Sequence, residues 1–405
     1  MKGVRICILI LALFGVWILP VGCGGNSGST TTSSTTTQTI VTSGTNVQTI
    51  TVNGGPPSIP EYPQPNTVFT SVTVCEHGST SNCATIDYVM VDTGSSGLRL
   101  LSSAFAGSSL SLQTETTKDG NQIGECVQFS DLSYVWGPVK TVDVYLANGN
   151  EIAYSVPIHI LDSTFFKIPD DCSSGFTLED DLNSLGANGI LGIGLSQYDC
   201  SFGGTNYCAS GSVPSGTYYE CSTSGCTSAP VILSQQVQNP VALFSTDNNG
   251  VIIELPSVSS PILSLTGSMV FGIGTQTNNA LDSAKQLFID QNGYVNTTFN
   301  GTVVSSYIDS GSNAYFFQDT IAQDSNEWYI PSSTLTFSAI IGNKTDVSFR
   351  VGNADNMFNK YPTYAVFNTL AGYLNGSFTW GLPFFYGRNV YTSITSQGDS
   401  AYWAF

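Results

Sequence analysis

The stretch from Val89 to Leu100 reads VMVDTGSSGLRL, and it carries one carboxylate, Asp92, directly after an apolar run and before a turn of glycine and serine. A second stretch, from Ser305 to Phe317, reads SSYIDSGSNAYFF and repeats the pattern 217 residues further along, with Asp309 in the matching position. A single Asp-x-Gly turn after a strand is ordinary. A pair of such turns, one in each half of the chain, is far more specific and predicts a chemical role for the two carboxylates.

Two carboxylates held about 3 Å apart cannot both ionise, so they share one proton and divide the roles of acid and base. Such a pair can activate a water molecule for attack on a peptide carbonyl and can protonate the developing oxyanion, with no metal and no cofactor. The glycines of the two loops would allow tight turns, and the hydroxyls of Thr93 and Ser310 would lock the loops together by hydrogen bonds. The expected supporting residues are Thr93, Gly94, Ser95, Ser310, Gly311 and Ser312.

These loops resemble those of the two-lobed pepsin-like aspartic peptidases, and in particular those of an exported bacterial family with a pepsin-like arrangement. Three further stretches resemble elements of that fold: NGILGIG at 188–194, GSMVFGIG at 267–274 and WGLPFFYG at 380–387. The resemblance covers residues 66–405. It implies a bilobal, all-β double barrel with a cleft between the lobes, an endopeptidase with Asp92 and Asp309 as catalytic residues, and Gly192 and Gly381 in segments that thread behind the two loops.

The sequence departs from the family pattern at the flap, a β-hairpin that carries a tyrosine over the cleft in pepsin-like enzymes. The matching position holds Phe129, with Tyr134 and Trp136 nearby, and these three residues are the candidates for flap and substrate contacts. Arg99, beside the first loop, is also unusual for that neighbourhood.

The rest of the chain has the pattern of an all-β protein. Short runs of β-branched and aromatic residues alternate with Asn-Gly turn signals, and helical periodicity is scarce. We expect hairpin turns rather than calcium loops at the Asp/Asn-Gly sites, because these lack alternating carboxylates. The best runs for strands are 68–74, 88–91, 139–146, 251–255 and 303–308, and the best short helix is 177–185. The predicted lobes are residues 66–240 and 241–405.

The N-terminus has the features of an export signal. Lys2 and Arg5 precede an apolar run of 14 residues that ends at Leu19, and Cys23 follows shortly after. The pattern predicts a signal peptide over 1–22 and a lipid anchor on Cys23, the alternative being an ordinary cleaved signal. A Ser/Thr-rich and then Pro-rich segment over 23–65 is expected to be a flexible tether, so that folding begins near Asn66.

Eight further cysteines all lie between residues 75 and 226, and none lies beyond. An even number in an exported chain predicts up to four disulfides, with only local pairs such as Cys75 with Cys83 favoured by sequence. Metal binding is the weaker alternative, because the spacings are not CxxC pairs. The disulfide candidates are Cys75, Cys83, Cys126, Cys172, Cys200, Cys208, Cys221 and Cys226.

Composition excludes several functions. The chain has 405 residues and a net charge of −18, which disfavours nucleic acid as a partner because the phosphate backbone would repel it. Two histidines, His77 and His159, leave little material for a zinc site or a Ser/His/Asp triad. The expected partners are a polypeptide and, through Cys23, a membrane, and a monomer is favoured.

Two alternatives compete with peptidase activity. Both aspartates would be turn residues in a catalytically silent, peptide-binding or inhibitory protein of the same fold, a reading that the altered flap favours. A carbohydrate-binding envelope protein would instead use exposed aromatic side chains such as Trp328 and Trp403.

Overall fold

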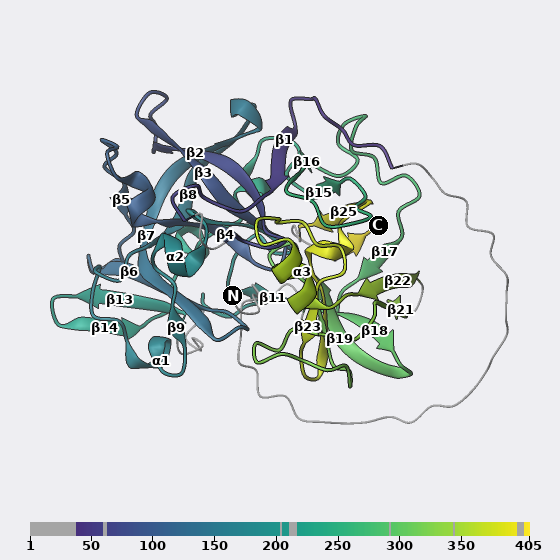
Figure 1. Cartoon of the computed structure of the whole chain (residues 1–405). Coiled ribbons are helices and arrows are strands. Elements are labelled where there is room, and N and C mark those ends of the chain that lie inside the picture. Colours follow the sequence, from purple (N-terminus) through teal and green to yellow (C-terminus); the bar gives the residue numbers. More distant parts are fainter. Residues whose placement is uncertain are drawn as a thin grey trace.

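The computed structural model describes residues 38–59, 63–202, 205–209, 217–290, 293–342, 345–394 and 401–405, which form a two-lobed, all-β molecule (Figure 1). The all-β prediction is confirmed. All five apolar runs expected to be strands lie in strands of the structure. Figure 1 shows the purple to teal N-terminal half on one side and the green to yellow C-terminal half on the other.

The first lobe is built on a closed ring of strand pairings. β2 (Val68–Glu76) pairs with β3 (Cys83–Asp92), β3 with β10 (Gly189–Ile193), β10 with β4 (Ser96–Leu101), β4 with β8 (Glu151–Leu161), β8 with β7 (Ser133–Leu146), and β7 returns to β2. Closure leaves no open edge in this barrel. Shorter strands extend it: β5 (Gln113–Thr114), β6 (Gln122–Gln128), β9 (Thr177–Leu178), β13 (Tyr218–Ser222) and β14 (Gly225–Ser228). A separate two-stranded sheet consists of β11 (Ser201–Phe202) and β12 (Thr205–Asn206).

A sheet between the lobes brings β1 (Val47–Val52) together with strands from the second half of the chain. Its order is β1, β16 (Leu265–Phe271), β15 (Gly250–Leu255), β25 (Arg388–Ser393), β26 (Tyr402–Ala404) and β17 (Gln286–Phe288). β1 also pairs with β2 of the barrel.

The expectation of a flexible tether reaching residue 65 is therefore wrong for the β1 segment. Residues 47–52 pair antiparallel with β16, and Ile50 and Val52 are fully buried. The polar composition of the region hid a strand whose partner lies more than two hundred residues away. The predicted division of the lobes between residues 240 and 241 remains a prediction.

The second lobe contains a seven-stranded sheet among the described residues. Its interior is a cluster of stacked and edge-packed rings that includes Phe317, Phe378 and Trp380. This aromatic core stabilises the half of the chain that has no cysteines. The strand order is β22 (Thr345–Val351), β21 (Leu335–Ile341), β18 (Val295–Phe299), β19 (Thr302–Ile308), β24 (Ser377–Trp380), β20 (Tyr315–Phe317) and β23 (Ala371–Tyr373).

Helices are few and short. The helix predicted over 177–185 is only one turn, α2 (Leu182–Leu185), capped by Asp181 and ended by Gly186 in a left-handed conformation. Thr177 and Leu178, the first residues of the predicted helix, instead form β9, which pairs with β7. Strand pairing therefore overrode the helical pattern. The other helices are α1 (Asp170–Ser173), α3 (Ala354–Lys360), η1 (Ser102–Phe105), η2 (Ala147–Gly149), η3 (Leu233–Gln235), η4 (Pro240–Leu243) and η5 (Leu382–Phe384).

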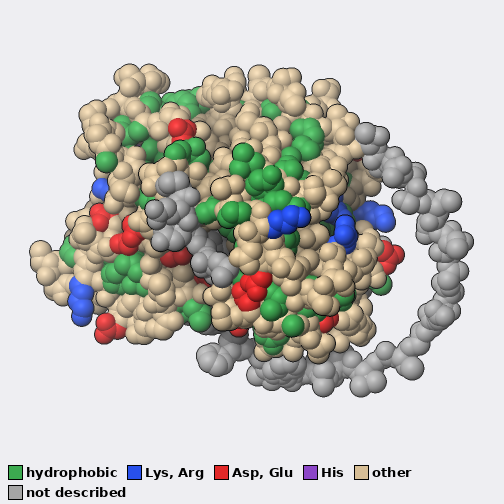
Figure 2. Space-filling model, in the orientation of Figure 1, with side chains coloured by type: hydrophobic (Ala, Val, Ile, Leu, Met, Phe, Trp, Pro, Cys, Tyr) green, Lys and Arg blue, Asp and Glu red, His purple; other side chains and the backbone are tan. Residues whose placement is uncertain are grey.

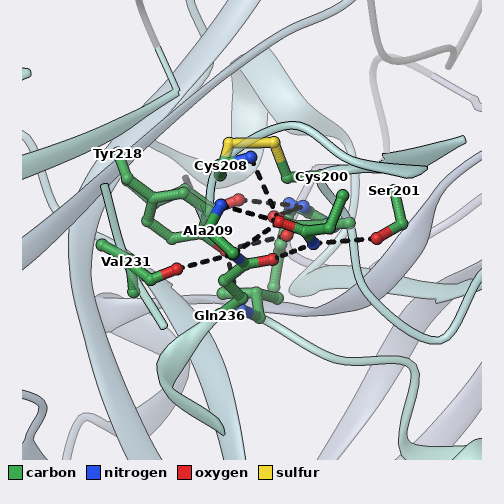
Figure 3. The surroundings of a disulfide bond; sticks show 12 residues. Cys200, Ser201, Cys208, Ala209, Tyr218, Val231 and Gln236 are labelled. Carbon is green, nitrogen blue, oxygen red and sulfur yellow. Dashed lines mark hydrogen bonds and ion pairs between the residues drawn. A yellow bond between two sulfur atoms is a disulfide. The ribbon is translucent and has the colours of Figure 1, made fainter. Parts of the chain in front are cut away.

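All eight predicted cysteines form disulfides. The expected local pair of Cys75 with Cys83 is confirmed, and the other three are Cys126–Cys172, Cys200–Cys208 and Cys221–Cys226. Figure 3 shows the Cys200–Cys208 bridge beside Gln236, whose amide donates to the Val231 carbonyl oxygen at 2.7 Å. The bridge closes a loop with little apolar content of its own.

Several features bear on the surface and on the N-terminus. Figure 2 shows a face with few charged side chains, as the low charge content implies. The predicted signal peptide and Cys23 lie outside the described residues. Within the part of the chain that the structure describes, no helix has the length and apolar character needed to cross a membrane.

Candidate active site

Asp92 is the last residue of β3 and is fully buried. β3 lies parallel to β10, which runs antiparallel to β4 on its other side, so Gly192 of β10 faces both Asp92 and Gly97. A Cβ atom on Gly192 would approach the Gly97 carbonyl oxygen to 2.8 Å. The glycine is therefore needed for this segment to pass so close behind the loop.

Asp309 follows β19 in the same way and is also fully buried. β19 lies parallel to β24, and the Asp309 amide donates to the carbonyl oxygen of Trp380 at 3.0 Å. The next residue, Gly381, has no room for a Cβ atom, which would lie 2.6 Å from the Ser312 carbonyl oxygen. The two halves of the chain thus build the same local structure from different sequences.

Each carboxylate is held by a matching pair of donors. Asp92 accepts hydrogen bonds from the Gly94 amide at 2.8 Å and from the Ser95 hydroxyl at 2.5 Å. Asp309 accepts them from the Gly311 amide at 2.8 Å and from the Ser312 hydroxyl at 2.5 Å.

The role expected for the two loop glycines is corrected in one respect. Neither Gly94 nor Gly311 has a left-handed backbone, and the left-handed residue of the first loop is Gly97, with φ of 105°. Gly94 and Gly311 contribute through their N–H groups, which donate to the carboxylates.

The two carboxyl groups lie close enough for each to change the pKa of the other. Burial raises the pKa of Asp92, and the interaction with Asp309 and the hydrogen bonds from Ser95 and Gly94 oppose that rise. Burial raises the pKa of Asp309 well above its ordinary value, and the charge of Asp92 adds to the rise. The pair is therefore an asymmetric, coupled acid pair.

The three flap candidates are buried in packing clusters. Phe129 lies among apolar side chains of the first lobe that include Met90 and Val135. Tyr134 and Trp136 pack with Tyr219 beside the Cys126–Cys172 bridge. The contacts of all three are packing contacts, and a role in binding substrate remains a prediction.

Arg99, which the sequence marked only as unusual, is the centre of a buried charge cluster. Its guanidinium contacts Glu125 at 3.0 Å and Asp199 at 3.2 Å, and all three residues are at most 3% exposed. The same group donates to the Ser96 carbonyl oxygen of the first loop at 2.8 Å. A lone arginine in an apolar strand was the available signal, but sequence could not show its partners.

The two histidines occupy different environments. His159 is fully buried and contacts Glu125 at 3.2 Å, and burial lowers its pKa well below the ordinary value. His77 is half-exposed and contacts Asp143 at 3.0 Å. Among the described residues, no group of three or more His, Cys, Asp or Glu side chains is arranged to hold a metal ion.

The aromatic residues expected to be exposed for carbohydrate binding are not available. Trp328 is fully buried against Phe316, and Trp403 is only 2% exposed in β26. That expectation is wrong for both residues, because each indole fills part of a core.

The fold and the two aspartate loops together define a bilobal, all-β protein in which two buried carboxyl groups lie on matching, hydrogen-bonded loops. Residues 42–405 match the model of the family described as "Protein of unknown function (DUF3443)", and the chain belongs to that family. Among solved structures, the aspartic proteinase from Irpex lacteus is similar, with 14% sequence identity, a TM-score of 0.43, and coverage of 88% of this chain and 96% of that chain. No curated protein sequence matches the chain.

Proposed function

We propose that this protein is an aspartic endopeptidase that hydrolyses peptide bonds in polypeptides, with Asp92 and Asp309 as its catalytic residues. The observation that carries the proposal is the reciprocal hydrogen bonding of Thr93 and Ser310, which directly follow two buried carboxyl groups, each held by a matching amide and hydroxyl donor. Structural aspartates at turns have no need of a second carboxylate as a neighbour, because burying two acids together is unfavourable.

The surroundings of the two carboxyl groups favour one division of the acid and base roles. Asp309 keeps the shared proton, since burial and the neighbouring charge both raise its pKa, and Asp92 is the base. Asp92 takes a proton from a water molecule whose oxygen attacks the peptide carbonyl carbon, while Asp309 gives its proton to the carbonyl oxygen. Asp92 then passes its proton to the leaving nitrogen as the C–N bond breaks, and Asp309 regains a proton from the collapsing diol.

The proposal includes a cellular location for the protein. Four disulfides favour an oxidising compartment and therefore export. Lipidation of Cys23 would hold the enzyme at a membrane surface of the cell envelope. A net charge of −18 disfavours nucleic acid as a substrate or partner.

A catalytically silent, peptide-binding protein is the second candidate. The burial of Phe129, Tyr134 and Trp136 in packing clusters favours it, because none of the three is free to close over a bound peptide in the manner of a flap.

The test uses the full chain with its disulfides intact, incubated with a denatured protein from about pH 3 to about pH 8. Asp92→Asn and Asp309→Asn are compared with Asp346→Asn, which changes an exposed aspartate on β22. Cleavage that is lost in the first two variants and kept in the third is the expected result. Folded wild-type protein that binds peptides and cleaves none at any pH would overturn the proposal in favour of the second candidate.

A further inference from the structure

Asn66 lies in the segment that leads from β1 into the first lobe, yet its side chain is fully buried against the second. Its Nδ2 group donates to the carbonyl oxygens of Asn313 and Phe367, both at 2.8 Å. Its Oδ1 atom accepts from the Phe367 amide and from the Tyr386 hydroxyl, both at 2.7 Å. A primary amide has two N–H donors and two acceptor sites, and all four are used here.

The backbone of Asn66 is fixed as firmly as its side chain. Its N–H donates to the Ala365 carbonyl oxygen at 2.6 Å. Its φ of 49° lies in the left-handed region, where asparagine is one of the few residues other than glycine that is readily accommodated. Neither the identity nor the conformation of this residue is incidental, since both are needed to make the bonds.

The partners of Asn66 belong to the machinery around Asp309. Asn313 is the residue after Ser312, whose hydroxyl donates to the Asp309 carboxylate. Tyr386 ends the segment that begins at Gly381 and threads behind the same loop. One amide therefore ties the second aspartate loop to the segment behind it and, through the chain, to the first lobe.

We propose that Asn66 is a positioning residue for Asp309, holding the second loop at the distance from the first that the acid pair requires. The inference rests on the proposed function, and it names a residue outside both aspartate loops that the reaction depends on. Arg99 holds the first loop from within its own lobe. Asn66 differs because it acts across the lobe junction.

The test removes a fully buried side-chain amide at two positions of the same N-terminal segment, Asn66 and Asn46. Asn66→Gly removes the amide while tolerating the left-handed backbone. Asn46→Ala is the matched control: Asn46 is also fully buried and its Nδ2 donates to the Phe271 carbonyl oxygen at 2.9 Å, at the end of β16 and away from both loops. Both proteins are assayed at a temperature at which each is folded.

We expect Asn66→Gly to lower kcat by about 10- to 100-fold with little change in KM, as displacement of a catalytic group by about 1 Å does. Asn46→Ala should keep kcat. A folded Asn66→Gly protein with wild-type kcat, or an equal loss of kcat in the control, would overturn the proposal.

Asn66→Asp tests the positioning role if the Asn66→Gly protein does not fold. It keeps the side-chain shape but, when ionised, turns acceptors toward two carbonyl oxygens, and protonation restores one donor. Its activity relative to wild type should therefore recover as the pH falls. An unchanged ratio across the pH range contradicts the inference.

A measurement independent of activity separates this inference from the proposed function. Carboxyl ¹³C NMR of aspartate-labelled protein follows the titration of the acid pair in a folded chain, whether or not the chain cleaves peptides. The titration of Asp309 should move in Asn66→Gly and stay in place in Asn46→Ala. If it is the same in both variants as in the wild type, Asn66 has no positioning role, even in an active enzyme.

Discussion

Thr93 and Ser310 bind each other reciprocally across the junction between the lobes. The backbone amide of Thr93 donates to the Ser310 hydroxyl at 3.1 Å, and the backbone amide of Ser310 donates to the Thr93 hydroxyl at 2.9 Å. Each hydroxyl then donates onward, to the carbonyl oxygens of Ile308 and Val91 respectively. Because each residue directly follows one of the two buried aspartates, this exchange limits how far apart the two carboxylates can lie.

Removing either hydroxyl should destabilise the junction. We expect Thr93→Val and Ser310→Ala each to lower the free energy of unfolding by about 1 to 3 kcal/mol, because each leaves a buried N–H unpaired. The double variant should lose less than the sum, since both changes break the same exchange. Urea unfolding measures all three. Thr392→Val is the control: its buried hydroxyl has no partner among the described residues, so it should cost little.

The serine beside Asp92 should set the acid limb of the activity. The Ser95 hydroxyl stabilises the ionised carboxylate and so lowers the pKa of Asp92. Ser95→Ala should raise that pKa and move the acid limb of the kcat/KM profile to higher pH. Ser96→Ala changes the neighbouring hydroxyl, for which the structure has no bond to either aspartate, and should leave the limb in place. A shift in both variants, or in neither, contradicts this assignment.

A second carboxyl pair should make stability fall as the pH rises. Glu151 of β8 lies beside Asp247, ahead of β15, and burial together with the charge of Asp247 raises the pKa of Glu151 to about 8. The folded state therefore holds a proton that the unfolded state releases near the ordinary glutamate pKa. Its contribution is fully present below that ordinary value and is lost as the pH rises through about 8.

Glu151→Gln tests this by keeping a donor to Asp247 that does not titrate. The decline in the free energy of unfolding across the neutral range should become shallower in this variant. Glu327→Gln, at an exposed position, should reproduce the wild-type slope. Urea unfolding at a series of pH values provides the measurement, and equal slopes in all three proteins are the contrary result.

The two carboxylates around Arg99 should contribute unequally to the free energy of unfolding. Burial raises the pKa of Glu125 well above its ordinary value, which favours its neutral form, so we expect the contact of the Arg99 guanidinium with Asp199 to matter more for stability. Arg99→Met should cost about 3 to 5 kcal/mol, because it leaves a buried charge without its partner. Asp199→Asn should cost more than Glu125→Gln, as measured by chemical unfolding. The reverse order would show that Glu125 carries the charge.

Local patterns in the sequence were sufficient for the repeated parts of the site. Two Asp-Ser/Thr-Gly loops after apolar runs predicted the two aspartates and the hydroxyls that link their loops, because each loop is a local pattern that repeats. Gly192 and Gly381 were predicted from the resemblance to pepsin-like peptidases and not from the loops themselves. The same locality allowed the all-β class and the Cys75–Cys83 pair to be predicted. It failed at Thr177, where a helical pattern yielded to pairing with β7.

Tertiary structure alone decided the parts that join distant segments. β1 was concealed in a polar region because its partner, β16, is far along the chain. The packing of Phe129 among Met90, Val135 and other apolar side chains could not be read from its position in the flap stretch. Asn66 has no motif, since its four side-chain bonds reach residues up to 320 positions away. The sequence by itself determined which carboxyl and hydroxyl groups are available for the proposed chemistry, and only folding decided what holds them in place, because hydrogen bonds across lobes leave no periodic trace in the chain.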